Sequence, residues 1–275
     1  MQAPKRIHTQ SDVFEVRETN NYPILAISSD FNTYVIKHNR GRIPADKLAV
    51  ELVASFFLNF FDIPTPLVSL VNVAEEHIYP VLSNFCQPAY FKIPCFGSKY
   101  LRYGMEMNDF LENMKSNEIN KFINREILLK IAFFDIWMAN DDRTPNNPNL
   151  LINPEEDGYY YIYAIDHESC FNTGNLHREL YTLDYYSSIL AHHAVKQIIG
   201  KLSKNKIIID NVIQDCYFCI ENCHRNLNEI LSYIPDEWGI NINTYRQLLI
   251  SKLFSNDWIQ TVKKSFLSFL QLLNH

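Results

Sequence analysis

Glycine is scarce in this sequence of 275 residues, and its scarcity excludes several nucleotide-binding motifs. No two of the seven glycines are close enough to form a GxG element; they are Gly41, Gly97, Gly104, Gly158, Gly174, Gly200 and Gly239. P-loops, dinucleotide-binding turns and glycine-rich phosphate loops all need closely spaced glycines. A nucleotide bound by this chain would therefore need its phosphates held in another way.

Disulfide scaffolds, membrane spans and a strongly basic surface are also not indicated. Six cysteines are too few for a disulfide framework, which favours a reducing, cytoplasmic setting. The start MQAPKRIHTQSDV has no apolar run typical of a signal peptide. The best apolar stretch, residues 127–139, is too short to span a bilayer and contains Lys130 and Asp135. The net charge of −6 argues against nucleic acid or an anionic membrane as the main partner.

Residues 1–84 predict a small antiparallel sheet with one helix. Short β-rich runs with turn residues between them occupy residues 13–17, 23–28, 33–38, 67–73 and 77–82. Residues 45–61 have helical periodicity, with Asp46 favourable near the N-terminus. Residues 85–104 contain two prolines and two glycines and are interpreted as a linker between two lobes.

Residues 105–275 predict a larger, mostly helical lobe. Helical patterns cover residues 117–139, 185–202, 208–234, 244–254 and 258–273. The exception is a hairpin formed by residues 149–153 and 159–166. The expected fold class is therefore α+β, with two lobes in one domain.

A polar turn after the helix of residues 117–139 carries the most distinctive chemistry. Asp142 lies in this turn, Asn147 follows five residues later, and Asp166 ends the next hairpin, so the three side chains should converge. Phosphoryl transfer needs one carboxylate near the attacking hydroxyl, and an amide and a second carboxylate on Mg²⁺. The alternative is an Asx-rich loop whose side chains cap their own backbone.

Two upstream residues favour the catalytic interpretation. Lys37 ends an apolar strand and is either an exposed strand lysine or a phosphate contact. Fourteen residues later, Glu51 is either a solvated charge or a carboxylate that orients Lys37. Glu51 belongs to a narrow polar stripe of the helix that also contains Lys47, Ser55 and Asn59.

A cysteine-rich segment has the spacing of a metal site. Cys216, Cys219, Cys223 and His224 read CxxCxxxCH. The surrounding residues are helical, so the three cysteines share one helix face, and a buried face is favoured over zinc.

Taken in order, these motifs resemble those of the HipA-like kinases, a branch of the protein-kinase and phosphoinositide-kinase-like fold. The matching pieces span about residues 25–175: YVIK at 34–37, LAVELVASFF at 48–57, FGS at 96–98, FDIWMANDDRTPNNPNLL at 134–151 and IDHESCF at 165–171. The resemblance implies a two-lobed kinase-like fold that uses ATP and Mg²⁺.

The resemblance also implies individual roles. Asp142 would be the catalytic aspartate, and Asn147 and Asp166 would bind the metal. Lys37 would hold the α- and β-phosphates while paired with Glu51.

One metal ligand has two candidates, and the sequence departs from the usual protein-kinase pattern after Asp142 and after Asp166. Asn149 competes with Asn147 as ligand because it directly precedes the apolar strand, although the five-residue spacing favours Asn147. Asp166 is followed by His167 and Glu168 rather than by the Phe-Gly of the kinase DFG triplet. Asp142 is followed by Arg143, as in lipid kinases and close HipA-like relatives, rather than by the usual Leu-Lys.

The expected phosphate loop also departs from the family pattern. It would be SSDFNT at residues 28–33, with no glycine. By resemblance, Ser28 and Ser29 would contact ATP and are candidate autophosphorylation sites, although ordinary turn serines are the simpler interpretation.

The sequence therefore predicts a kinase that phosphorylates a Ser or Thr hydroxyl of a protein. Two alternatives stay open: a catalytically impaired nucleotide-binding module, and a kinase for a small-molecule or lipid hydroxyl. The expected partner is a protein substrate, and the resemblance adds a neutralising partner of the antitoxin type.

Overall fold

A six-stranded sheet forms the first lobe. The computed structural model describes residues 2–274 except residues 20, 43 and 115. The sheet order is β1-β5-β6-β4-β3-β2. The strands are β1 Lys5–His8, β2 Glu15–Val16, β3 Ile24–Ile27, β4 Thr33–Lys37, β5 Val68–Asn72 and β6 Cys95–Lys99. All neighbouring strands are antiparallel except the edge pair β1 and β5, which is parallel.

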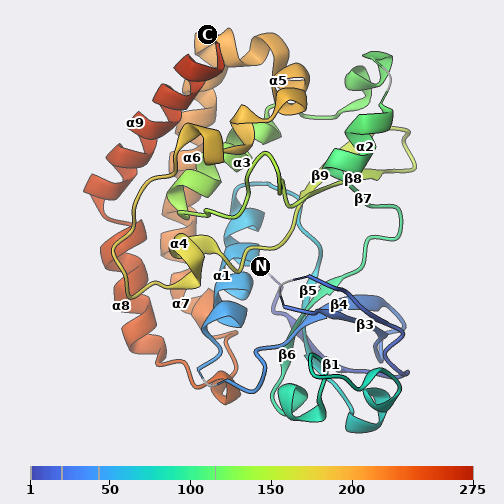
Figure 1. Ribbon diagram of the computed structural model, residues 1–275. Helices are drawn as coiled ribbons and strands as arrows, with labels where there is room; N and C mark the ends of the chain where they lie inside the picture. Colours follow the sequence, from blue (N-terminus) through green and yellow to red (C-terminus); the bar gives the residue numbers. More distant parts are fainter. Residues whose placement is uncertain (1, 20, 43, 115, 275) are drawn as a thin grey trace.

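The helix α1 (Asp46–Phe60) connects this sheet to the rest of the molecule, as Figure 1 shows. The predicted helix at 45–61 is confirmed, and Leu48 to Leu58 are all buried. On the opposite face of the sheet, Tyr34 and Ile36 pack with Ile78 and Phe91 of the segment between β5 and β6. That segment forms the 3-10 turns η1 Glu75–His77, η2 Tyr79–Val81 and η3 Pro88–Phe91. The strand expected at residues 77–82 is therefore wrong, because Pro80 has no N–H for a ladder.

Strand β6 lies inside the segment that was expected to be a linker. It pairs with both β4 and β5 in the middle of the sheet, so the first lobe continues to Lys99. Gly97 suits this position because an added Cβ would lie 2.5 Å from Val71 Cγ2. A glycine that the sequence presented as a loop residue is thus required by close packing between strands.

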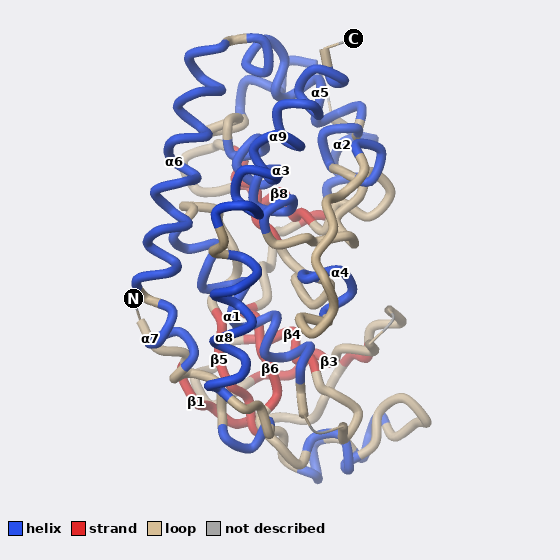
Figure 2. The backbone as a smooth tube through the Cα atoms, turned by 90° about the vertical axis from the view of Figure 1, so that its left-hand side faces the viewer, coloured by secondary structure: helices blue, strands red, loops and turns tan. Residues whose placement is uncertain are grey.

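The second lobe is mostly helical and surrounds a small sheet (Figure 2). Its helices are α2 Met107–Asn113, α3 Ile127–Trp137, α4 Cys170–Gly174, α5 His193–Ile199, α6 Lys206–Arg225, α7 Leu227–Leu231, α8 Ile242–Leu253 and α9 Asn256–Leu273. Short 3-10 turns join them: η4 Ser116–Lys121, η5 Tyr185–Ser187, η6 Ile189–Ala191, η7 Gly200–Lys204 and η8 Asp236–Trp238. The sheet contains β7 Met105–Glu106, β8 Leu150–Pro154 and β9 Tyr160–Ala164.

Helix α3 forms the centre of this lobe. All its residues except Lys130 are buried, and it packs against α6 and α9. The helix expected from residue 117 begins ten residues later, because η4 and a turn precede it. The β8–β9 hairpin follows α3, as expected.

The cysteine-rich segment is part of α6. Cys216, Cys219 and Cys223 are buried along one face of this helix, which confirms the packing interpretation. His224 stacks on Phe254, with ring centroids 4.7 Å apart.

Over the part of the chain that the structure describes, no helix is long and apolar enough to cross a membrane.

Candidate active site

The ammonium group of Lys37 meets three carboxylates where the two lobes face each other. It forms an ion pair with Glu51 of α1. Its Nζ lies 2.7 Å from Asp166 Oδ1 and 3.7 Å from Glu168 Oε2. Lys37 and Glu51 are 9% and 1% exposed. The structure thus brings together Lys37, Glu51 and Asp166, which the sequence singled out from three separate elements.

Burial and charge act in opposite directions in this cluster. Burial alone would lower the pKa of Lys37, but the charges of Asp166, Glu51 and Glu168 outweigh it and raise that pKa. Burial raises the pKa of Glu51 to about 7, although the charge of Lys37 opposes this change. Burial would also raise the pKa of Asp166, but the nearby charge of Lys37 lowers it. Lys37 is therefore charged, and Asp166 is ionised at neutral pH.

Asp142 lies in the turn after α3, and two amides orient its carboxylate. Its Oδ2 accepts hydrogen bonds from Asn147 Nδ2 at 3.1 Å and from Asn149 Nδ2 at 2.9 Å. Within the described parts of the chain, Asp142 Oδ1 has no hydrogen-bond partner. The two amides thus hold one carboxylate oxygen and leave the other free of hydrogen bonds from the described residues.

Arg143 fixes this turn through contacts with α3 and with the end of the β8–β9 hairpin. Its side chain is fully buried and forms an ion pair with Asp135 of α3. Its Nη2 donates to the Ile165 carbonyl oxygen at 3.0 Å and lies 2.9 Å from His167 Nδ1. Burial lowers the pKa of His167, and the charges of Arg143 and Lys37 lower it further, so the imidazole is neutral and accepts this hydrogen bond. Arg143 thereby fixes the turn of Asp142 relative to the end of the β8–β9 hairpin.

The two candidate amide ligands have different surroundings. Asn147 is exposed and closes a local turn with Thr144. Asn149 is 8% exposed, and its carbonyl oxygen accepts from the backbone N–H of Ile165 at 3.0 Å. Asn149 therefore lies directly beside the strand end that carries Asp166. Asn149 and Asp166 both have positive φ, at 47° and 54°, a conformation that Asn and Asp tolerate better than most residues.

Ser28 and Ser29 do not lie near this cluster. They follow β3 at the end where Ile27 pairs with Thr33, whereas Lys37 ends β4 on the opposite side. Five strand residues separate these ends by about 13 Å. Ser28 is fully buried, and its hydroxyl group has no partner among the described residues. The structure thus does not bring the SSDFNT loop to Lys37.

The described residues of the connection between β2 and β3, 17–19 and 21–23, lie toward the Lys37 end of β4 instead, because Ile24 pairs with Ile36. Asn21 in this loop donates a hydrogen bond to Glu168 Oε1. Lys47 of α1 lies 3.0 Å from the same oxygen. Sequence reasoning assigned no role to Asn21 or Glu168. The only sequence signal was that Glu168 stands where the DFG triplet of the usual protein kinases has glycine.

The carboxylate oxygens of this cluster suit a divalent cation. Glu51, Asp166 and Glu168 each offer one oxygen, and the three oxygens lie within 4.8 Å of one another. The side chain of Asp166 is 39% exposed, against 2% for Glu51 and 12% for Glu168. Asp166 is thus the most accessible of the three carboxylates, and Mg²⁺ and similar hard cations prefer oxygen donors of this kind.

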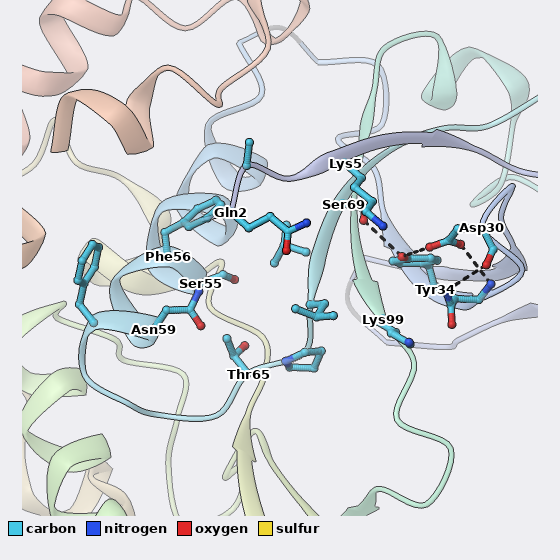
Figure 3. A pocket seen from close by; sticks show the side chains of 16 residues that line it. Gln2, Lys5, Asp30, Tyr34, Ser55, Phe56, Asn59, Thr65, Ser69 and Lys99 are labelled. Carbon is cyan, nitrogen blue, oxygen red and sulfur yellow. Dashed lines mark hydrogen bonds between the residues drawn. The ribbon is translucent and has the colours of Figure 1, made fainter. Parts of the chain in front are cut away.

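A separate cavity of about 450 Å³ lies beside the second half of α1 (Figure 3). Ser55 and Asn59, from the second half of the polar stripe on α1, line it together with Tyr34, Asp30 and other residues. None of Lys37, Glu51, Asp142 or Asp166 lines this cavity. The polar stripe therefore divides: Lys47 and Glu51 face the charged cluster, and Ser55 and Asn59 face the cavity.

Comparisons with known proteins identify similar families and folds. The family model described as HipA-like kinase matches residues 14–265. The crystal structure of a Helicobacter pylori proinflammatory kinase, CtkA, superposes with a TM-score of 0.52 at 14% identity, covering 98% of both chains. A Golgi casein kinase structure with Mn/ADP bound gives a TM-score of 0.46 at 13% identity, covering 98% of this chain and 73% of that one. No curated protein matches the chain significantly.

Proposed function

The chain belongs to the HipA-like kinase family, and on that premise we propose that it transfers the γ-phosphoryl group of ATP to a Ser or Thr hydroxyl of a protein. One observation carries the proposal. Lys37 forms ion pairs with the buried Glu51 and with the more exposed Asp166 between the lobes. Asp142 lies in the turn that Arg143 links by a hydrogen bond to Ile165, the residue before Asp166.

In the proposed reaction, the acceptor hydroxyl oxygen attacks the γ-phosphorus, and the bond to the β–γ bridging oxygen breaks. Asp142 Oδ1 accepts the hydroxyl proton, while the amides of Asn147 and Asn149 hold Oδ2. Lys37 neutralises phosphate charge, and Glu51 fixes the direction of its ammonium group. ADP and the phosphorylated hydroxyl are the products.

Asp166 and Asn149 are the residues that would hold a divalent cation such as Mg²⁺. We prefer Asn149 to Asn147 because the backbone of Asn149 is bonded to Ile165, the residue before Asp166. When bound, the cation would neutralise charge on the phosphate oxygens.

The decisive test is incubation with γ-labelled ATP and Mg²⁺, alone and with cell lysate, followed by mapping of phosphorylated residues. We expect label on Ser or Thr of a protein, and no label when Mg²⁺ is chelated. If ATP and Mg²⁺ stabilise the protein but no protein is labelled, the chain is a nucleotide-binding module instead. Label on a small molecule or lipid would correct the acceptor and leave the phosphotransfer intact.

A further inference from the structure

Glu168 connects the hairpin end to three elements of the first lobe. Its Oε1 accepts a hydrogen bond from Asn21 in the β2–β3 loop and lies 3.0 Å from Lys47 Nζ on α1. Its Oε2 lies 3.7 Å from Lys37 Nζ on β4. The side chain is 12% exposed, so these contacts are largely shielded from water. One carboxylate therefore reaches the loop, the strand and the helix that surround the proposed phosphate site.

Two of these three partners, Lys37 and Asn21, carry donor groups of the kind that bind nucleotide phosphates. Phosphate oxygens bind ammonium and N–H donors, as a carboxylate does. Of the three carboxylates around Lys37, Glu168 is the most distant, at 3.7 Å against 2.7 Å for Asp166. It is thus the partner that a phosphate replaces most easily. Lys47 remains available to Glu168 after such a replacement, because it contacts the other carboxylate oxygen.

We propose that Glu168 is a gate that competes with the nucleotide phosphates for Lys37 and Asn21, and that it keeps only its contact with Lys47 when a nucleotide enters. This inference rests on the proposed function, because it concerns the same nucleotide site. Glu168 also adds one negative charge beside the polyphosphate, which weakens nucleotide binding further. The β2–β3 loop is poor in glycine, and its contact with Glu168 is made by a side chain, that of Asn21, which is consistent with this role.

The variant Glu168→Gln tests the gate directly, because it removes the charge and keeps the size and an acceptor for Asn21. Removing the negative charge of Glu168 beside the negatively charged phosphates should tighten Mg·ADP binding about tenfold in isothermal titration calorimetry. The variant Lys47→Ala should weaken binding several-fold, because Glu168 then keeps only Lys37 and Asn21. The double variant should bind like Glu168→Gln alone. The matched control is Glu156→Gln, at an exposed turn of the β8–β9 hairpin, and it should bind as the wild type does.

Each outcome decides the matter. If the wild type binds Mg·ADP and Glu168→Gln binds it equally or more weakly, the gate is wrong while the proposed function stands. If Glu168→Gln instead needs more Mg²⁺ for the same binding, Glu168 is a metal ligand and the gate is again wrong. If neither the wild type nor any variant binds nucleotide, the proposed function and the gate both fail. Lys47 is half exposed, so Lys47→Ala tests the proposal even if Glu168→Gln does not fold.

Discussion

At the scale of single residues, Glu51 gives the protein a defined pH dependence. Its pKa is raised by burial from 4.5 to about 7, so the folded state binds a proton more tightly than the unfolded state does. This contribution to stability is fully present below about pH 4.5 and is lost as the pH rises through about 7. The free energy of unfolding of the wild type, relative to Glu51→Gln, should therefore fall over this range. Urea titrations of both proteins at several pH values measure it, and a constant difference would refute the assignment.

The choice between the two amide ligands can be decided by metal dependence. We expect Asn149→Ala to raise the Mg²⁺ concentration for half-maximal phosphotransfer at least about tenfold, in line with the loss of a metal ligand or its support. Asn147→Ala should change it much less, because Asn147 is exposed and bonds only within its own turn and to Asp142. The reverse order of effects would return the role to Asn147.

The buried ion pair beneath the catalytic turn supports its position. Asp135→Asn leaves the fully buried Arg143 without its counter-charge, and loss of one partner of a buried pair costs about 3–5 kcal/mol of unfolding free energy. Asp215→Asn is the matched control, because Asp215 also pairs with a residue of α3, Lys130, but its side chain is 61% exposed. Chemical denaturation should show a cost below about 1 kcal/mol for this control. Equal costs for both variants would show that the Arg143 pair has no special role.

At the scale of elements, Gly97 in β6 offers a test of the packing between strands. Gly97→Val would place a branched side chain where even a Cβ lies 2.5 Å from Val71 Cγ2. We expect a loss of about 1–3 kcal/mol, as for other overpacked sites. Ser98→Val, one residue along and partly exposed, should cost less. Urea denaturation of the two variants makes the comparison, and similar stability would mean that β5 and β6 are less closely packed than the structure shows.

Strongly periodic elements were predictable, and elements decided by tertiary contacts were not. The helix α1, the β3–β4 pair and the β8–β9 hairpin have clear periodicity, so they were expected close to their observed bounds. Strand β6 has the sequence CFGSK, whose glycine and lysine do not favour a strand. It forms a strand because it pairs with β4 on one side and β5 on the other. Periodicity describes one element at a time and cannot show packing between elements.

The same limit applies to the site. Lys37, Glu51, Asp142 and Asp166 could be predicted because each lies in an element with a recognisable motif. The distance between the SSDFNT loop and Lys37 follows from the chain order, because the loop directly precedes β4 and Lys37 ends this strand. The contacts of Asn21 and Glu168 could not be predicted, since 147 residues of sequence separate them.

At the scale of the whole molecule, a nucleotide that contacts both lobes should stabilise them together. Mg·ATP binds only the folded state, so at a concentration of 1,000 times Kd it should add about 4 kcal/mol to the free energy of unfolding. Lys37→Ala should remove most of this increase, because Lys37 is the cation of the proposed phosphate site. Thermal unfolding with and without Mg·ATP measures both values. An equal increase in the variant would place the nucleotide elsewhere, for example in the cavity lined by Ser55 and Asn59.

The central claim is that Asp142 accepts the hydroxyl proton during phosphoryl transfer. It is tested most directly by the rate of γ-phosphoryl transfer from labelled ATP in purified wild type, Asp142→Asn and the exposed hairpin-turn control Asp157→Asn. Loss of a general base predicts a rate about 10²–10⁴-fold lower for Asp142→Asn, with Mg·ATP binding and thermal stability kept, and a wild-type rate for Asp157→Asn. Transfer by Asp142→Asn at the rate of the wild type would contradict the claim.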